Sequence, residues 1–97
     1  MRKFLQDKVI VVTGASSGIG EAMAREYAKM GAKVVMAARR ENELRRIATE
    51  IEQAGGKVAY VVCDVTREEE CRHLVDVAVD RFGRIDIMIC NAGLSMR

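Results

Sequence analysis

Short β-branched runs alternate along this chain with segments whose apolar residues recur every three or four positions. The β-branched runs are typical of buried strands, and the spaced apolar residues are typical of amphipathic helices. The predicted strands cover residues 9–12, 34–38, 58–63 and 85–90. The predicted order of elements is therefore β-α-β-α-β-α-β.

Each predicted helix lies between two of these strands and is followed by glycine, which suits the left-handed position after a helix. We expect one apolar face of each helix to be buried, although the first face also carries Glu26. Thr66 and Glu69 have the spacing of a capping box for the third helix. The expected buried faces are Ile19, Ala22, Met23, Tyr27 and Met30, then Leu44, Ile47, Ala48 and Ile51, then Cys71, Leu74, Val75, Ala78, Val79 and Phe82.

Strands that alternate with helices predict an α/β fold with a parallel sheet and right-handed crossovers. The first three strands then step in one direction with their helices on one face, and the fourth strand lies on the other side of the first. This order creates a switch point between the first and fourth strands, where open α/β sheets bind ligands at the carboxyl ends of the strands. Gly14 and Asn91 directly follow those two strand ends.

Residues 13–20 join the first strand to the first helix and read Thr-Gly-Ala-Ser-Ser-Gly-Ile-Gly. A dinucleotide pyrophosphate needs nearby backbone N–H groups and the positive end of a helix dipole. We expect Gly14 to allow the sharp exit from the strand, Gly18 to let the backbone touch the phosphates, and Gly20 to let the helix pack on the strand. The candidate phosphate-binding residues are Gly14, Ser16, Ser17, Gly18, Ile19 and Gly20.

A plain strand-to-helix turn is the alternative interpretation of this segment. The glycine spacing, Gly-x-x-x-Gly-x-Gly, differs from the commonest dinucleotide fingerprint. No lysine follows the last glycine, which argues against a P-loop of the kinase type.

The ends of the other strands carry residues suited to the rest of a dinucleotide. Arg39 and Arg40 follow the second strand, where a cation favours the 2′-phosphate of NADP and an acid favours NAD. We therefore expect NADP rather than NAD; the alternative is a solvated pair of arginines held near Glu41 or Glu43. Asp64 and Val65 are candidates for contacting adenine, and Asn91, Ala92 and Gly93 are candidates for lying beside the nicotinamide ribose.

Composition narrows the class of protein. The 97 residues are 49% hydrophobic and 31% charged, which is typical of a soluble globular chain. The net charge of +2, with acids and bases interspersed, argues against binding to nucleic acid or an anionic membrane. Polar residues 6–8 interrupt any export signal, so we expect a cytoplasmic protein.

The cysteines and the histidine do not indicate a metal site. Cys63, Cys71 and Cys90 lie in apolar runs without the spacing of metal ligands, so we expect reduced core residues. His73 is the only histidine and is expected on a helix surface.

Taken together, these residues resemble the amino-terminal part of the short-chain dehydrogenase/reductase family. The resemblance runs from residue 8 to about residue 93 and includes the glycine turn, Asp64, residues 82–86 (Phe-Gly-Arg-Ile-Asp) and residues 91–93 (Asn-Ala-Gly) in the family's order and spacing. Cys90 departs from the pattern, because many members have Asn there. The resemblance implies a Rossmann-type doubly wound parallel sheet, of which this chain is the first half. It also implies an oxidoreductase that interconverts ketones and alcohols by hydride transfer.

The resemblance places the family's chemistry in a downstream Ser and a Tyr-x-x-x-Lys, and neither is found in this sequence. Gly31 stands four residues after Tyr27, Asp64 stands four residues after Tyr60, and Ser95 follows Asn-Ala-Gly too closely. We therefore assign no catalytic residue and expect residues 1–97 to be a partial NAD(P)-binding domain, inactive alone. For the parent protein we expect a small carbonyl or alcohol substrate and a homo-oligomer.

Two other function classes stay open. A non-catalytic nucleotide-binding module would use the same fold without hydride transfer. A methyltransferase that uses S-adenosylmethionine is less favoured, because such enzymes usually want an acid after the second strand, where Ala38 and Arg39 stand.

Overall fold

The computed structural model describes residues 4–16 and 18–91 and confirms the predicted alternation of strands and helices. The strand ends differ from the predicted ones by at most two residues. Within the described ranges, each helix is too short or too polar to cross a lipid bilayer. The elements are β1 (Val9–Thr13), α1 (Gly18–Lys29), β2 (Lys33–Ala38), α2 (Glu41–Gln53), β3 (Lys57–Val62), α3 (Glu68–Phe82) and β4 (Ile87–Cys90).

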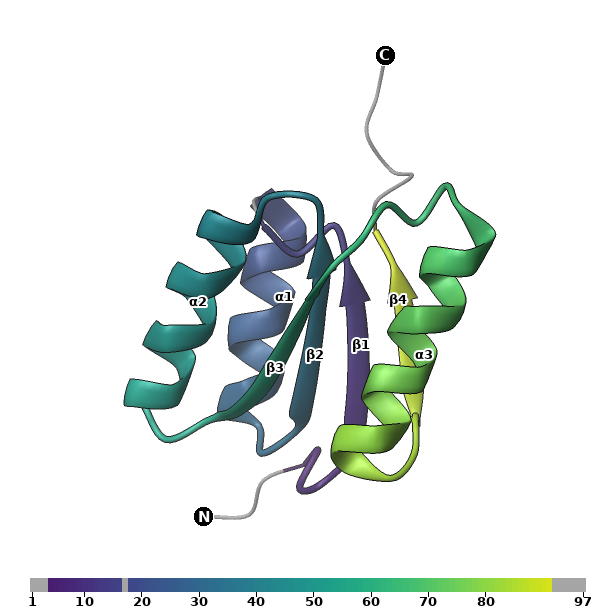
Figure 1. The fold of residues 1–97 in the computed structure, drawn as a ribbon. Helices are drawn as coiled ribbons and strands as arrows, with labels where there is room; N and C mark the ends of the chain where they lie inside the picture. Colours follow the sequence, from purple (N-terminus) through teal and green to yellow (C-terminus); the bar gives the residue numbers. More distant parts are fainter. Residues whose placement is uncertain (1–3, 17, 92–97) are drawn as a thin grey trace.

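The four strands form one parallel sheet in the order β3-β2-β1-β4 (Figure 1). Val11 in β1 lies opposite Val35 in β2 on one side and opposite Met88 in β4 on the other. The crossover through α3 carries the chain from the outer strand β3 back past β1, so the strand order reverses between β1 and β4. The predicted switch point is confirmed, and all four strands end at one edge of the sheet, which we call the carboxyl edge.

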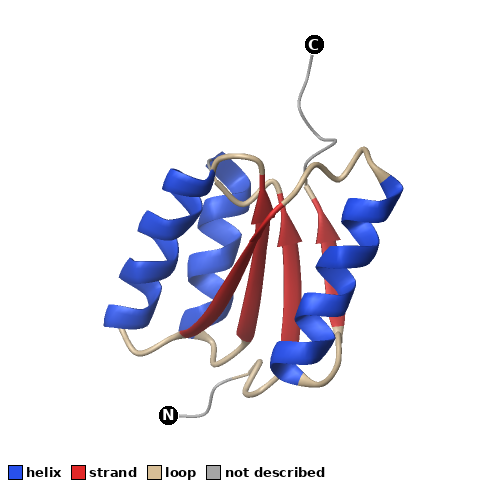
Figure 2. Ribbon diagram, in the orientation of Figure 1, coloured by secondary structure: helices blue, strands red, loops and turns tan. Residues whose placement is uncertain are grey.

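Helices α1 and α2 cover one face of the sheet, and α3 covers the other (Figure 2). Alternate residues of β1 therefore enter separate clusters: Ile10 and Val12 pack with α1 and α2, and Val11 packs with α3. With both faces covered, all five residues of β1 are buried. In β4, Ile87 and Met88 are each 41% exposed.

The prediction of which face of α1 is buried is wrong, because the helix is rotated about its axis relative to the prediction. Ile19 is 68% exposed and Ala22 is also exposed, whereas Met23 and Tyr27 are half-buried. A stripe of small residues faces the sheet instead, because it lets the helix approach the strands closely. The buried residues of α1 are Gly20, Ala24 and Ala28.

The predicted capping box at the start of α3 is also wrong. The helix is preceded by Arg67, which makes no side-chain capping hydrogen bond, and Glu69 pairs with that arginine. The Thr66 hydroxyl donates instead to Asp64 Oδ1 at 2.6 Å. This local turn competes with capping, since the short side chains of Asp and Thr readily bond to nearby groups.

Asp86 ties the beginning of β4 to the beginning of β1. The N–H of Val9 donates to Asp86 Oδ2 at 2.8 Å, and the N–H of Asp86 donates to the carbonyl oxygen of Val9 at 2.9 Å. Arg84 Nε lies 2.9 Å from the same carboxylate oxygen. The hydrogen bond from Val9 and the Arg84 guanidinium hold the pKa of Asp86 below its ordinary value.

Candidate dinucleotide-binding site

The carboxyl edge brings together residues that are far apart in the sequence. Gly14 follows β1, Arg39 follows β2, Asp64 comes two residues after β3, and Asn91 follows β4. The connecting loops lie at the upper edge of the sheet in Figure 1. The predicted site residues therefore share one edge, as the parallel topology requires.

The glycine turn has the backbone geometry that its glycines permit. Gly14 and Gly18 have φ values of +65° and +60°, a left-handed conformation that other residues adopt only with strain. The N–H of Ala15 donates to the carbonyl oxygen of Ala37 at 3.1 Å, which joins the turn to the end of β2. Ser16 in this turn is half-buried. Ser17 lies outside the described residues.

Gly20 lies where the turn and the new helix are closest. A methyl group added at Gly20 would collide with the carbonyl oxygen of Gly14 and lie 2.8 Å from Asn91 Nδ2. The predicted tight packing at this position is therefore confirmed. A methyl group added at Gly18 would meet open space, and the Ile19 residue is 68% exposed.

Asn91 connects the end of β4 to the glycine turn. Its Nδ2 donates to the carbonyl oxygen of Gly14 at 3.3 Å, and its N–H donates to Thr13 Oγ1 at 2.9 Å. Thr13 in turn donates to the carbonyl oxygen of Ile89 at 3.3 Å. The sequence interpretation included Thr13 in the glycine turn but gave it no role in the site, although a polar residue ending an apolar strand was the signal. Ala92 and Gly93 lie outside the described residues.

Arg39 and Arg40 are exposed at the end of β2, next to the turn. Arg40 precedes α2 with an extended backbone, and its carbonyl oxygen accepts from the N–H of Leu44 at 3.1 Å. Among residues 4–16 and 18–91, no carboxylate lies within 4.0 Å of either guanidinium; Glu41 and Glu43 pair with other arginines. Glu41 and Glu43 therefore make no ion pair with Arg39 or Arg40 in this part of the chain, and both arginines are solvated.

Asp64 is half-buried above the end of β3. Its Oδ1 accepts from the N–H of Thr66 at 3.0 Å as well as from the Thr66 hydroxyl. These hydrogen bonds, aided by the charges of Arg39 and Arg67, hold the pKa of Asp64 below its ordinary value. The carboxylate is therefore ionised at neutral pH and able to accept further hydrogen bonds. Val65, next along the chain, is also half-buried.

Comparison with known proteins identifies the family. The family model described as short chain dehydrogenase matches residues 8–97. The chain belongs to this family.

Among the short chain dehydrogenases it resembles is 11-beta-hydroxysteroid dehydrogenase A of Sesamum indicum, 51% identical over 90% of this chain and 25% of the relative. A short chain dehydrogenase from Mycobacterium smegmatis has a similar solved structure, with a TM-score of 0.91 and 37% identity over 99% of this chain and 41% of that one. An actinorhodin polyketide ketoreductase solved with NADPH has a TM-score of 0.85 and 40% identity over 90% of this chain and 33% of that one. The chain thus spans less than half the length of each of these proteins.

The three cysteines have different environments, so the prediction that all are core residues is wrong. All are free thiols: Cys63 is buried, Cys71 is partly exposed and Cys90 is exposed. Burial raises the pKa of the Cys63 thiol, with a smaller effect from Cys71. Cys71 Sγ donates to the carbonyl oxygen of Val65 at 3.1 Å.

An apolar cavity of about 230 Å³ lies between α3 and the sheet, near the carboxyl edge. Most of its lining residues are apolar, and Val65 is the one predicted site residue among them. A dinucleotide is polar and larger than this cavity, so the candidate site is the exposed carboxyl edge itself. The cavity is lined by Thr13, Val65, Cys71, Leu74, Val75, Met88 and Cys90.

Proposed function

We propose that the protein is an NADP(H)-dependent oxidoreductase that interconverts ketones and alcohols, and that residues 1–97 supply its dinucleotide-binding half. One observation carries the proposal. The glycine turn is tied to Asn91 at one neighbouring strand end and lies next to two exposed arginines, Arg39 and Arg40, at the other.

The glycine turn and the start of α1 would hold the pyrophosphate. The positive φ values of Gly14 and Gly18 turn the chain sharply into a helix of 12 residues, whose first N–H groups have no partners within the helix. The open space around Gly18 supports its role in close approach to a phosphate. Ser16 and Ser17 would contribute donors from the same turn, and exposed Ile19 would pack on the bound cofactor.

Arg39 and Arg40 would bind the 2′-phosphate that distinguishes NADP from NAD. Guanidinium groups pair strongly with phosphate because their N–H donors match its geometry. Neither arginine has a described carboxylate within 4.0 Å that would compete for it. The NADPH complex of the similar ketoreductase supports this choice of nucleotide by analogy.

Asp64 and Val65 would contact the adenine, the first by accepting from its amino group and the second by packing on the ring. The ionised Asp64 carboxylate at the end of β3 suits the first role. Asn91, Ala92 and Gly93 would pass beside the nicotinamide ribose. The hydrogen bonds of Asn91 to Thr13 and Gly14 support a fixed position for Asn91.

When bound, the nicotinamide cofactor supplies or accepts the hydride. The residues of this chain bind and orient it, and none of them is proposed to move the substrate proton. No tyrosine in residues 1–97 has a lysine four residues later. A small carbonyl or alcohol is the proposed substrate class.

The protein encoded by the complete gene tests this proposal. We expect it to reduce members of a panel of ketones with NADPH, and we expect purified residues 1–97 to give no turnover. Since proton transfer by a positioned residue contributes about 10²–10⁴-fold, loss of that residue alone would suppress the rate strongly. The rival function, a nucleotide-binding module without chemistry, predicts tight NADPH binding and no turnover by the complete protein.

A further inference from the structure

Three carboxylates lie at the starts of α1 and α2, beside the proposed phosphate sites. Glu21 directly follows Gly20, Glu41 directly follows Arg40, and Glu43 comes two residues after Glu41. The helix dipole favours acids at these positions. The same charges oppose the binding of a phosphate nearby, since a phosphate monoester carries about −1.5 to −2 near neutral pH.

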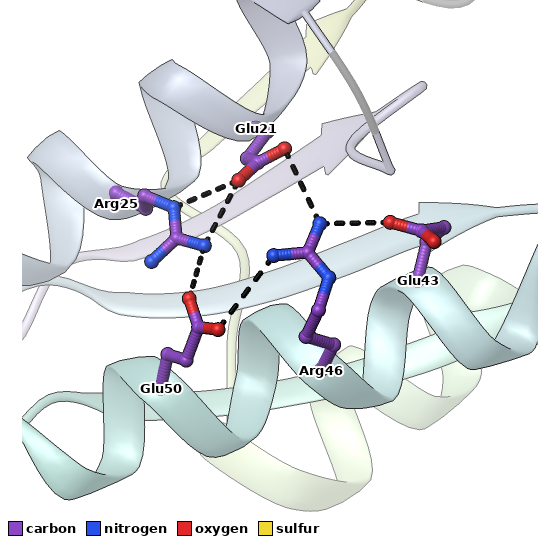
Figure 3. A network of polar contacts seen from close by, with 5 residues as sticks. All are labelled: Glu21, Arg25, Glu43, Arg46 and Glu50. Atoms are coloured by element: carbon purple, nitrogen blue, oxygen red, sulfur yellow. Dashed lines mark hydrogen bonds and ion pairs between the residues drawn. The ribbon is translucent and has the colours of Figure 1, made fainter.

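Arginines one turn further along α2 hold these carboxylates. Arg46 Nη2 lies 2.7 Å from Glu43 Oε1 and 3.8 Å from Glu21 Oε1. Arg45 Nη2 lies 3.2 Å from Glu41 Oε2. Figure 3 shows the Arg46 guanidinium between Glu21 and Glu43, so one cation serves both helix starts.

The rest of this network fixes Arg46 in place. Arg46 Nη1 lies 3.6 Å from Glu50 Oε2, and Arg25 Nη2 lies 2.6 Å from Glu50 Oε1 and 2.9 Å from Glu21 Oε2 (Figure 3). The hydrogen bond with Glu43 is the main cause that raises the pKa of Arg46. The guanidinium therefore remains charged over the whole range of ordinary pH.

Local charge explains why this pairing matters. Residues 39–43 contain two arginines and two glutamates, so by themselves they carry no net charge. Arg45 and Arg46 neutralise the two glutamates through their ion pairs. Glu41 and Glu43 then offset less of the positive charge that Arg39 and Arg40 present to a ligand, and Asp64 is the other carboxylate that senses Arg39. At a Debye length of about 8 Å in physiological salt, neighbours within one helical turn still interact.

We propose that Arg46 is a specificity-determining positioning residue: by holding Glu43, it keeps that carboxylate from opposing the 2′-phosphate of NADP(H) at Arg39 and Arg40. The inference rests on the proposed function, because it requires the phosphate at those two arginines. Arg46 acts through Glu43 and needs no contact with the cofactor. An ion pair with a purely structural role would stabilise α2 and leave the choice between nucleotides unchanged.

Two nucleotides that differ only in the 2′-phosphate, 2′,5′-ADP and 5′-ADP, test this role by calorimetry on the protein encoded by the complete gene. We expect Arg46→Gln to weaken 2′,5′-ADP binding by about twofold to fivefold in low salt. Binding of 5′-ADP should be unchanged, because Glu21 at the proposed pyrophosphate site keeps its 2.9 Å ion pair with Arg25. Adding Glu43→Gln to this variant should restore the wild-type affinity, since no unpaired carboxylate remains there. At 1 M salt, where the Debye length is about 3 Å, the loss should shrink.

Lys57→Gln is the matched control, because it removes one cation and an exposed ion pair with Asp7 (3.5 Å). Lys57 begins β3, at the opposite edge of the sheet, so this variant should bind both nucleotides normally. Equal weakening of the two nucleotides by Arg46→Gln would overturn the inference. So would an equal loss of 2′,5′-ADP affinity with and without Glu43→Gln.

Arg39→Gln separates failure of this inference from failure of the proposed function. If the wild type prefers 2′,5′-ADP and Arg39→Gln abolishes the preference, the proposed function is supported. The inference about Arg46 is then tested by the Arg46 variants alone. If the wild type shows no preference and Arg39→Gln changes nothing, the NADP assignment fails and the inference falls with it.

Discussion

The side-chain amide of Asn91 donates a hydrogen bond to the carbonyl oxygen of Gly14, 3.3 Å away, across 77 positions of sequence. This bond holds the end of β4 against the turn that follows β1. Both groups lie at the switch point of the sheet, so the bond fixes the end of β4 beside the glycine turn of the candidate site.

Replacing Asn91 with Ala should loosen the contact between β4 and the glycine turn. We expect the free energy of unfolding to fall by about 1 kcal/mol and NADPH binding to weaken by about threefold to tenfold, as for one lost hydrogen bond. Urea unfolding and calorimetry measure the two effects. Gln53→Ala, an exposed change at the end of α2, is the control. Unchanged NADPH affinity in Asn91→Ala would contradict the assigned role.

Replacing Gly20 with Ala should disrupt the contact between the turn and α1. The added methyl group meets the Gly14 carbonyl, which is backbone, so we expect a loss of about 1–3 kcal/mol or more together with weaker NADPH binding. Gly83→Ala is the comparison. Gly83 has a φ of +87° and open space around an added methyl group, so we expect this variant to lose about 1–2 kcal/mol of stability from backbone strain alone. Only the change at Gly20 should affect the nucleotide. Equal NADPH affinities in the two variants would refute this.

Replacing Arg39 with Asp should shift the nucleotide preference toward NAD(H). The change removes a charge-assisted partner of the 2′-phosphate and adds a repelling carboxylate. We expect the ratio of kcat/KM for NADPH over NADH to fall on the order of tenfold to a hundredfold. Arg72→Asp, at an exposed arginine of α3, is the control. Equal kcat/KM values of the wild-type protein for NADPH and NADH would contradict the NADP assignment.

Replacing Asp86 with Asn should remove a pH-dependent contribution to stability. The folded pKa of Asp86 is depressed, so its contribution is present above the ordinary pKa of about 3.9 and is lost as the pH falls through the folded pKa. The difference in unfolding free energy between wild type and Asp86→Asn should be constant near neutral pH and shrink below about pH 4. Urea titrations from pH 3 to 7 measure it, with exposed Asp80→Asn as control. A difference that grew on acidification would have the wrong sign.

Local patterns along the chain predict the elements, their order and the edge of the sheet at which the candidate site residues gather. The handedness of the crossovers and the period of the apolar residues are enough to predict the order of strands in the sheet. The glycines of residues 13–20 likewise predict the turn that the structure contains. These features depend on neighbours in sequence or on general rules of chain geometry, so they can be inferred without coordinates.

The tertiary structure alone shows which face of α1 is buried and how the charged groups are partnered. Hydrophobicity ranks Ile19 above Gly20, yet close packing on the sheet favours the smaller residue, and Ile19 is left exposed. Likewise, Glu43 has arginines on both sides in sequence, and only the position of α1 beside α2 places Arg46 between Glu21 and Glu43. The physical reason is that packing and ion pairing depend on distances between separate elements, which a one-dimensional pattern does not contain.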